Sequence, residues 1–201
     1  MYEFLRVIFT WFFCKFCHTE ISGTENMPPE GGVILAANHL SNWDPPFLGT
    51  FILRPISYMA KKELFNIPVF NRCIIHLHAF PVKRGAADRG AIKAALTVLK
   101  EGRCVGLFPE GTRSRDGEVH KAEAGVALLA AKSGVPVVPA AITGTNLIFS
   151  GGSFFPDLYV SYGEPVFFEG RANDRAALEQ FSEKIMQEIV KMKKKHGKDT
   201  P

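Results

Sequence analysis

A histidine and an aspartate five positions apart are the residues of this chain best suited to chemistry. His39 follows the apolar run Val33–Ala37, which predicts a short buried strand, and Asp44 precedes two prolines. Pro45 suits the first turn of a helix, and Asp44 suits its N-cap. A histidine at a strand end and a carboxylate at a helix start can face each other across the loop. A general base needs this arrangement, because one imidazole nitrogen takes the substrate's proton while a carboxylate holds the other.

The same two residues also have a purely structural interpretation. Asp44 can serve only as a helix cap, and His39 can bond only to nearby backbone, since caps of this kind are common. The local pattern leaves both interpretations open, and the choice between them depends on the rest of the chain.

A second loop offers groups suited to an anionic ligand. It follows the predicted strand 103–108 and contains Glu110, Gly111, Thr112 and Arg113. Gly111 allows close backbone approach, Thr112 offers a hydroxyl, and the planar guanidinium of Arg113 can bind phosphate through two hydrogen bonds. The alternative is an exposed polar loop with an ordinary Arg–Asp surface pair.

Two further cations follow predicted strands. Lys61 ends one strand and Arg84 follows another. Together with Arg113 they would offset the roughly two negative charges of a phosphomonoester. Such fixed donors act through positioning and electrostatics.

The elements that must hold these residues predict an α/β fold. We expect one domain with a mixed, largely parallel central sheet flanked by helices. The expected strands are 19–23, 33–37, 56–60, 79–82, 103–108, 135–142, 159–163 and 166–168, with the last two at an edge. The expected helices are 45–53, 87–100 and a closing amphipathic helix around 178–192, with a broken helical stretch at 63–77.

Residues 1–18 are predicted to form a membrane-associating helix ahead of the α/β domain 19–201. Nearly all of its side chains are apolar, and its polar residues fall on one narrow stripe from Glu3 to Cys17. The segment is too short and interrupted for a comfortable membrane span, and it lacks a signal-peptide cleavage site. We expect it to lie in the membrane interface, with the stripe towards the protein or the headgroups. The alternative is a helix packed into the protein's own core.

The composition bounds the partners and the chemistry. The chain has 201 residues, of which 46% are hydrophobic and 22% charged, as in one ordinary globular domain. A net charge of +4 is too small to indicate nucleic-acid binding, and no nucleic-acid-binding motif is present.

The pair Cys14–Cys17 lacks the second half of a zinc site, and His76 and His78 lack a carboxylate partner, so we expect no metal. Cys73 and Cys104 lie in apolar segments and are predicted to be buried thiols of a reduced, cytosolic-facing protein.

The first motif resembles that of the glycerolipid acyltransferases. His39 and Asp44 with four residues between them, preceded by Asn38, are most similar to the motif of bacterial 1-acylglycerol-3-phosphate acyltransferases. Three later stretches extend the resemblance in the family's order over residues 30–145. They are Lys61-Lys62-Glu63-Leu64 with Pro81-Val82-Lys83-Arg84-Gly85, then Phe108-Pro109-Glu110-Gly111-Thr112-Arg113-Ser114, then Val135-Pro136-Val137-Val138-Pro139.

This resemblance implies a reaction and its residues. His39 would activate the acceptor's hydroxyl and Asp44 would orient it. The acceptor would contact Glu110, Gly111, Thr112 and Arg113 together with Lys61 and Arg84. The acceptor would be 1-acylglycerol 3-phosphate, and the donor an acyl thioester of coenzyme A or acyl carrier protein. Direct transfer would give phosphatidic acid with no other cofactor.

The N-terminal helix and the cysteines together predict a place in the cell, and the chain departs from the family pattern at one point. We expect the protein to sit on the cytoplasmic face of the cell membrane as a monotopic or peripheral protein. Glycines are expected near positions 71 and 78, where this chain has Asn71 and His78. The course of that loop, and with it the role of Arg84, stays open.

Other functions are less compatible with the sequence. The chain has no Gly-x-Ser-x-Gly elbow of a serine hydrolase and no glycine pattern of a P-loop or dinucleotide enzyme. A non-catalytic membrane lipid-binding protein would not need His39, Asp44, Glu110 and Arg113 together. Acyl transfer to glycerol 3-phosphate or to a lysophospholipid with a larger headgroup remains an alternative, because the motifs are shared.

Overall fold

A computed structural model describes most of the chain. The described residues are 2–66, 71, 74–75, 78–82, 89–114, 116–150 and 155–196, without the side chains of 61, 62, 64, 81, 82 and 196. Cys73, His76 and Arg84 therefore lie outside the described residues.

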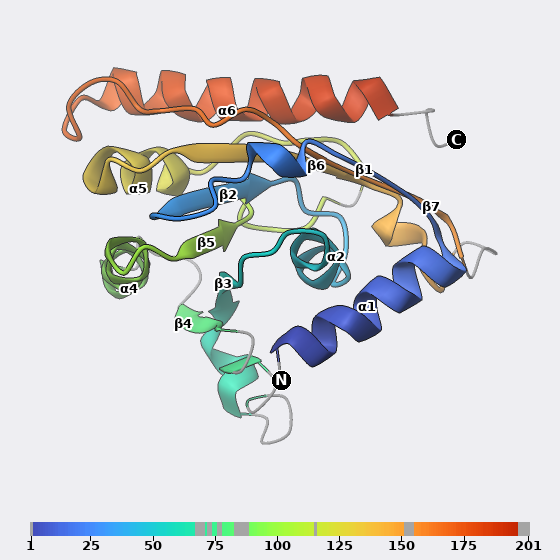
Figure 1. The fold of residues 1–201 in the computed structure, drawn as a ribbon. Helices are drawn as coiled ribbons and strands as arrows, with labels where there is room; N and C mark the ends of the chain where they lie inside the picture. Colours follow the sequence, from blue (N-terminus) through green and yellow to red (C-terminus); the bar gives the residue numbers. More distant parts are fainter. Residues whose placement is uncertain are drawn as a thin grey trace.

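A sheet of seven described strands runs through the middle of the molecule (Figure 1). The strands are β1 (His18–Ser22), β2 (Val33–Ala37), β3 (Ile56–Lys61), β4 (Phe80–Val82), β5 (Cys104–Leu107), β6 (Val137–Thr143) and β7 (Asp157–Tyr162). Their order is β1-β7-β6-β2-β5-β3-β4, and every neighbouring pair is parallel except β6 and β7. The prediction of a mixed, largely parallel α/β sheet is confirmed.

Helices cover both faces of the sheet (Figure 1). On one face lie α1 (Tyr2–Phe16) and α2 (Asp44–Thr50), and on the other α4 (Arg89–Lys100), α5 (Gly125–Ser133) and α6 (Arg175–His196). Short 3-10 turns are η1 (Thr24–Asn26), η2 (Lys62–Asn66) and η3 (Thr145–Leu147). Helix α5 is absent from the sequence-based expectations, because its short, alanine-rich segment has no clear polar face.

Strand β2 lies between β6 and β5 and carries the candidate motif at its end. All five of its residues are buried, and alternate side chains enter the cores on the two faces of the sheet. A continuous apolar run is typical of a parallel strand covered on both sides. The strand thereby delivers His39 to the carboxyl edge of the sheet, where open α/β sheets bind ligands.

Helix α1 packs on the protein mainly by aromatic residues, and Cys17, the last residue of the polar stripe, is buried with them. Phe13 is fully buried, and its ring centre lies 4.9 Å from that of Phe47 on α2. On the outer side, Phe4, Val7 and Trp11 remain 66%, 63% and 59% exposed. One face of the helix thus belongs to the core, as in the alternative interpretation, while another apolar face stays open.

Two expectations about the later strands are wrong. Segment 159–163 is not at an edge, because β7 lies between β1 and β6. Residues 166–168 form no regular strand, and Val166 makes only an isolated bridge with Val137. The cause is the parallel pairing of β1 with β7, which joins segments far apart in the chain and leaves β1 as the edge strand.

His78 occupies a backbone conformation that favours glycine. Its φ is 58°, in the left-handed region where a side chain is strained. The N–H groups of His78 and Ala79 donate to Ile75 O and Ile74 O at 2.9 Å and close the turn before β4. The expected glycine near this position therefore has a structural reason, even though this chain carries a histidine there.

Candidate active site

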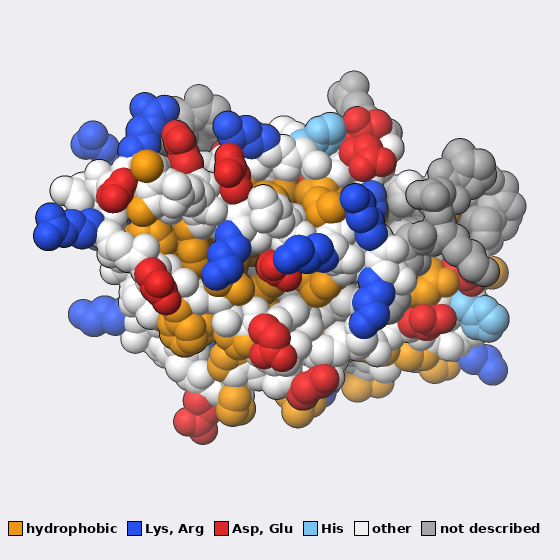
Figure 2. All heavy atoms as spheres, turned by 90° about the horizontal axis from the view of Figure 1, so that it is seen from above, with side chains coloured by type: hydrophobic (Ala, Val, Ile, Leu, Met, Phe, Trp, Pro, Cys, Tyr) orange, Lys and Arg blue, Asp and Glu red, His pale blue; other side chains and the backbone are white. Residues whose placement is uncertain are grey.

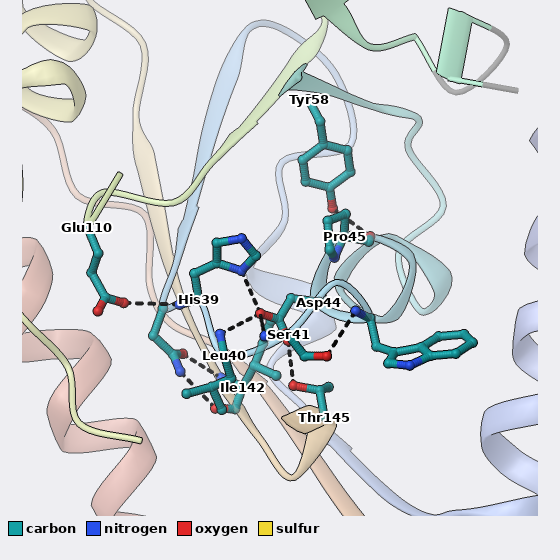
Figure 3. Close-up of polar contacts among 11 residues, drawn as sticks. His39, Leu40, Ser41, Asp44, Pro45, Tyr58, Glu110, Ile142 and Thr145 are labelled. Atoms are coloured by element: carbon teal, nitrogen blue, oxygen red, sulfur yellow. Dashed lines mark hydrogen bonds and ion pairs between the residues drawn. The ribbon is translucent and has the colours of Figure 1, made fainter. Parts of the chain in front are cut away.

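His39 and Asp44 face each other across the loop between β2 and α2 (Figure 3). Nδ1 of His39 lies 2.7 Å from Oδ2 of Asp44. The two side chains are 10% and 0% exposed, so water cannot compete freely for this contact. The structure brings together the two residues that the sequence singled out.

Asp44 binds the loop behind it and does not cap its helix. The helix starts with Trp43 as N-cap and has no side-chain cap hydrogen bond, so the predicted capping role is wrong. Besides His39, Oδ2 accepts hydrogen bonds from the backbone N–H groups of Leu40 and Ser41 at 2.6 and 2.7 Å. Oδ1 accepts one from the hydroxyl of Thr145. An ionised carboxylate only accepts, so His39 carries its proton on Nδ1 in this arrangement.

Two tyrosines, the partly buried Tyr58 and the buried Tyr162, fix the helix that carries Asp44. Tyr58 donates its hydroxyl to Pro45 O at 2.9 Å, and Tyr162 donates to Leu48 O at 2.7 Å. Burial raises the pKa of both phenols well above the ordinary value, so they keep their protons and remain donors. They fasten α2 to β3 and β7, and thereby fix the position of Asp44 relative to the sheet.

Asn38 extends the β2–β6 pairing to the residue before His39. It is fully buried, its Nδ2 donates to Ile142 O at 2.9 Å, and its Oδ1 accepts from Ile142 N at 2.8 Å. One side chain thus replaces a backbone pairing at the point where β2 ends. The peptide leading into His39 is held against β6.

The ring of His39 is held in one orientation. Phe108 stacks on it with ring centres 4.0 Å apart and planes 15° from parallel. Within the described part of the chain no hydrogen bond to Nε2 is formed. With Nδ1 protonated, Nε2 carries the free lone pair and can accept a proton.

Glu110 lies beside the histidine and binds backbone groups. Its carboxylate is largely buried and accepts a hydrogen bond from His39 N at 3.0 Å (Figure 3). It also accepts one from His120 N at 3.1 Å. In addition, Ser114 N donates to His39 O at 2.8 Å. The 110–114 loop therefore runs along the backbone of His39 and is hydrogen-bonded to both its N–H and its carbonyl group. A contact of Glu110 with the acceptor stays a prediction.

The rest of the loop presents two exposed groups. Gly111 has φ 69°, a left-handed backbone conformation that strains other residues and therefore favours glycine. Thr112 and Arg113 are exposed. Arg113 precedes Ser114, whose N–H is bonded to the His39 carbonyl, so the backbone of Arg113 is held near the histidine while its side chain is exposed.

The other two predicted cations are placed less fully. Lys61 is the last residue of β3, which is parallel to β5, so its backbone lies at the same sheet edge as Phe108 and the 110–114 loop. The Lys61 side chain and all of Arg84 lie outside what the structure describes.

An aromatic surface leads from α1 to the residue beside Asp44. The Phe12 ring stacks 5.7 Å from that of Trp43, and Phe149 lies 5.8 Å from Trp43. Phe155 in turn stacks 5.2 Å from Phe16. Apolar side chains of α1 and of the segment after β6 thus adjoin the start of α2.

Sequence reasoning missed Thr145. It lies 101 positions after Asp44, in the turn that follows β6, and no local pattern marks it.

Cys104 is buried as expected, and burial raises the pKa of its thiol to about 12. Among the described residues, no group of three or more His, Cys, Asp or Glu side chains is arranged so that it could hold a metal ion. None of the described helices is both long and apolar enough to cross a bilayer.

Comparisons with known proteins agree with the motifs. A family model described as Acyltransferase matches residues 18–143. The chain is 35% identical over 132 residues to 1-acyl-sn-glycerol-3-phosphate acyltransferase of Borreliella burgdorferi, covering 64% of this chain and 52% of that protein. It is 37% identical over 151 residues to the enzyme of the same name from Bacillus subtilis, covering 73% of each. The chain thus spans about half the length of the first relative and nearly three quarters of the second.

A solved structure shares the fold. The chain is similar to the crystal structure of the 1-acyl-sn-glycerophosphate (LPA) acyltransferase PlsC from Thermotoga maritima, with a TM-score of 0.75 and 31% identity. The match covers 96% of this chain and 78% of that one.

Proposed function

The chain belongs to the acyltransferase family, and we propose that it moves a fatty acyl group from an acyl thioester to the free hydroxyl of 1-acylglycerol 3-phosphate, giving phosphatidic acid. The observation that carries this proposal is the buried 2.7 Å contact between His39 Nδ1 and Asp44 Oδ2, with Nε2 left to act as a base. The names and identities of the two bacterial relatives support the choice of acceptor.

The proposed reaction is a direct transfer. Nε2 of His39 takes the proton of the acceptor hydroxyl as its oxygen attacks the thioester carbonyl carbon. The negative charge of Asp44 stabilises the imidazolium that forms. Collapse of the tetrahedral intermediate breaks the carbon–sulfur bond, and the departing thiolate receives the proton from Nε2. General-base help of this kind contributes roughly 10²–10⁴-fold.

The 110–114 loop is the proposed phosphate site. Arg113 is exposed next to the segment bonded to His39, and its guanidinium can bind two phosphate oxygens. Thr112 offers a hydroxyl beside it. Lys61 and Arg84 belong to the same proposal through the family motif, and with Arg113 they would offset the charge of the phosphomonoester.

The outer face of α1 is the proposed membrane contact. Phe4, Val7 and Trp11 are more than half exposed there, and each large side chain that leaves water for lipid gains roughly 1.5–3 kcal/mol. The aromatic surface continues to Trp43, so a lipid acceptor in the interface would reach the site without leaving the membrane surface. The face that carries α6 is different, because charges of both signs cover it (Figure 2). We expect that face to point to water.

An assay of purified protein tests the acceptor and the donor together. Acyl-coenzyme A and acyl-acyl carrier protein are each combined with 1-acylglycerol 3-phosphate, glycerol 3-phosphate and 1-acylglycerophosphocholine. We expect phosphatidic acid from the first acceptor at a far higher kcat/KM than any product from the other two. A preference for another acceptor, or no product from any, would contradict the proposal.

The role of His39 is tested against a matched histidine. His39→Ala should abolish transfer while thermal unfolding stays cooperative. His18 pairs with Asp157 at 3.6 Å and is exposed on the edge strand β1, with β7 and β6 between it and β2, so His18→Ala should keep normal activity. Normal turnover in folded His39→Ala protein would remove the mechanism.

The membrane contact is tested with two equally exposed aromatic residues. Trp11 on α1 and Phe167 after β7 are both 59% exposed. Trp11→Ser should lower partition onto phospholipid vesicles by about 10–100-fold, and Phe167→Ser should leave it unchanged. Equal effects of the two substitutions would mean that α1 has no special part in membrane binding.

A further inference from the structure

Thr145 reaches the catalytic pair from a distant part of the chain. Its side chain is fully buried, and its hydroxyl donates to Oδ1 of Asp44. In Figure 3 it lies on the opposite side of the carboxylate from the His39 ring. None of the other described groups hydrogen-bonds to Oδ1, whereas Oδ2 has three donors.

We propose that Thr145 is a positioning residue for acyl transfer, which holds the plane of the Asp44 carboxylate so that Oδ2 stays on Nδ1 of His39. The proposal rests on the proposed acyl transfer for its effect on rate. It concerns a residue outside the four sequence motifs, and it assigns that residue an action through Asp44 rather than a contact with substrate.

The carboxylate plane needs a second anchor. The terminal torsion of an aspartate side chain is broad, so the torsion itself does not fix the plane. The three donors on Oδ2 meet at one oxygen and therefore fix the position of that atom better than they fix the rotation of the group around it. A single donor on Oδ1 decides this rotation, and Thr145 is that donor.

The backbone around Thr145 is built to hold it there. Gly144 before it has φ 89°, and a Cβ at Gly144 would lie 2.1 Å from Asp157 O, so the turn requires glycine. Ile142, three residues before Thr145, is bonded on both its N–H and its carbonyl to the side chain of Asn38. The end of β6 thus holds the residue before His39 through two hydrogen bonds, and the turn after β6 holds Asp44 through a third. The histidine and the hydroxyl share one rigid frame.

Three substitutions and one control separate this role from a general effect on folding. Thr145→Val keeps the shape and removes the donor, whereas Thr145→Ser keeps the donor. Thr50 is also buried and donates its hydroxyl to Pro46 O at 2.6 Å on α2, without contact to Asp44, so Thr50→Val is the matched control. Thr145→Cys replaces the hydroxyl with a weak donor and serves if the valine variant does not fold.

The measurements are kcat and acceptor KM with 1-acylglycerol 3-phosphate, and the proton NMR resonance of the buried His39 Nδ1–H. We expect Thr145→Val to lower kcat about 10- to 100-fold, the range for loss of a hydrogen bond to a charged group, with KM nearly unchanged. In this variant the His39 Nδ1–H resonance should change its chemical shift, or disappear because the proton exchanges faster with water. Thr145→Ser and Thr50→Val should keep both kcat and the resonance, and Thr145→Cys should fall below Thr145→Ser.

The outcomes distinguish this inference from the proposed function. The positioning role is overturned if the wild-type protein is active and Thr145→Val has the same kcat as the wild type. It is also overturned if Thr145→Cys has the same kcat as Thr145→Ser. Either result leaves the proposed function standing. A wild-type protein inactive on every acceptor would overturn the proposed function. In that case the resonance alone decides, and an unchanged Nδ1–H signal in Thr145→Val or Thr145→Cys would overturn the inference as well.

Discussion

Replacing Asp44 by asparagine and by alanine should separate its two tasks, one in folding and one in catalysis. Its carboxylate receives four hydrogen bonds, from His39 Nδ1, Leu40 N, Ser41 N and Thr145 Oγ1. The side chain is fully buried, so a lost acceptor is not replaced easily by water.

Asparagine can keep all four contacts. Its carbonyl oxygen can take the place of Oδ2 and accept the same three N–H groups, while its amide group donates to the hydroxyl of Thr145, which then accepts. The fold should survive, and Nδ1 should stay protonated. The negative charge that stabilises the imidazolium is lost, so we expect kcat to fall roughly 10²–10⁴-fold.

Alanine removes the acceptor altogether. Four donors lose their partner at a net cost of about 1 kcal/mol each, so Asp44→Ala should lose about 3–4 kcal/mol of its free energy of unfolding. For a chain of this size, that loss corresponds to a fall in Tm of roughly 6–16 °C. The lost free energy is a large part of a typical total free energy of unfolding.

The two variants are compared by acyl-transfer kinetics and by thermal unfolding. We expect Asp44→Asn to show that loss of kcat but to stay within about 3 °C of the wild-type Tm, since its donors stay paired. Asp44→Ala should be both inactive and much less stable. Full activity in Asp44→Asn would refute the catalytic reasoning, and a wild-type Tm in Asp44→Ala would refute the structural reasoning.

Three further predictions follow from the described residues. Arg113→Ala should raise the acceptor KM about 10- to 100-fold with little change in kcat, and an unchanged KM in steady-state assays would place the phosphate elsewhere. Cys14 is exposed on the outer part of α1, while Cys104 is buried with its pKa raised to about 12. Peptide mass spectrometry after alkylation should therefore find Cys14 modified in the native protein, protected by vesicles, and Cys104 modified only after unfolding. Hydrogen bonds from the Ser114 hydroxyl and the Glu118 N–H lower the pKa of Asp116 from 3.8 to about 2. Its contribution to stability is thus complete above pH 3.8 and is lost as the pH falls through 2, so an NMR titration midpoint near 3.8 would contradict this contact.

Local patterns in the sequence accounted for most of the elements near the site. The apolar run of β2 predicts a strand covered on both faces, and the two prolines after Asp44 predict a helix start. The spacing of His39 and Asp44 predicts their approach, because both belong to one short loop whose two ends are fixed by regular structure. The order of the four motifs indicates the family for the same reason, since each motif is contiguous in the chain.

Contacts between distant segments were beyond such patterns. The pairing of β1 with β7 moved a strand expected at the edge into the sheet, and the side chain of Asp44 turned from its helix to the loop behind it. Glu110 reads as a ligand-binding residue in its motif, yet its carboxylate lies on the backbone of His39, 71 positions away.

What the sequence by itself determined is therefore the presence of a histidine, its acidic partner and a loop of groups suited to an anion, at the ends of parallel strands. Side-chain type and short-range periodicity are sufficient for that, because they follow from the geometry of single strands and helices. Only the tertiary structure decided how the pair is held. The support comes from Asn38, Thr145 and Glu110, each bonded to a partner on another strand or loop, and such contacts exist only once the sheet has brought those segments together.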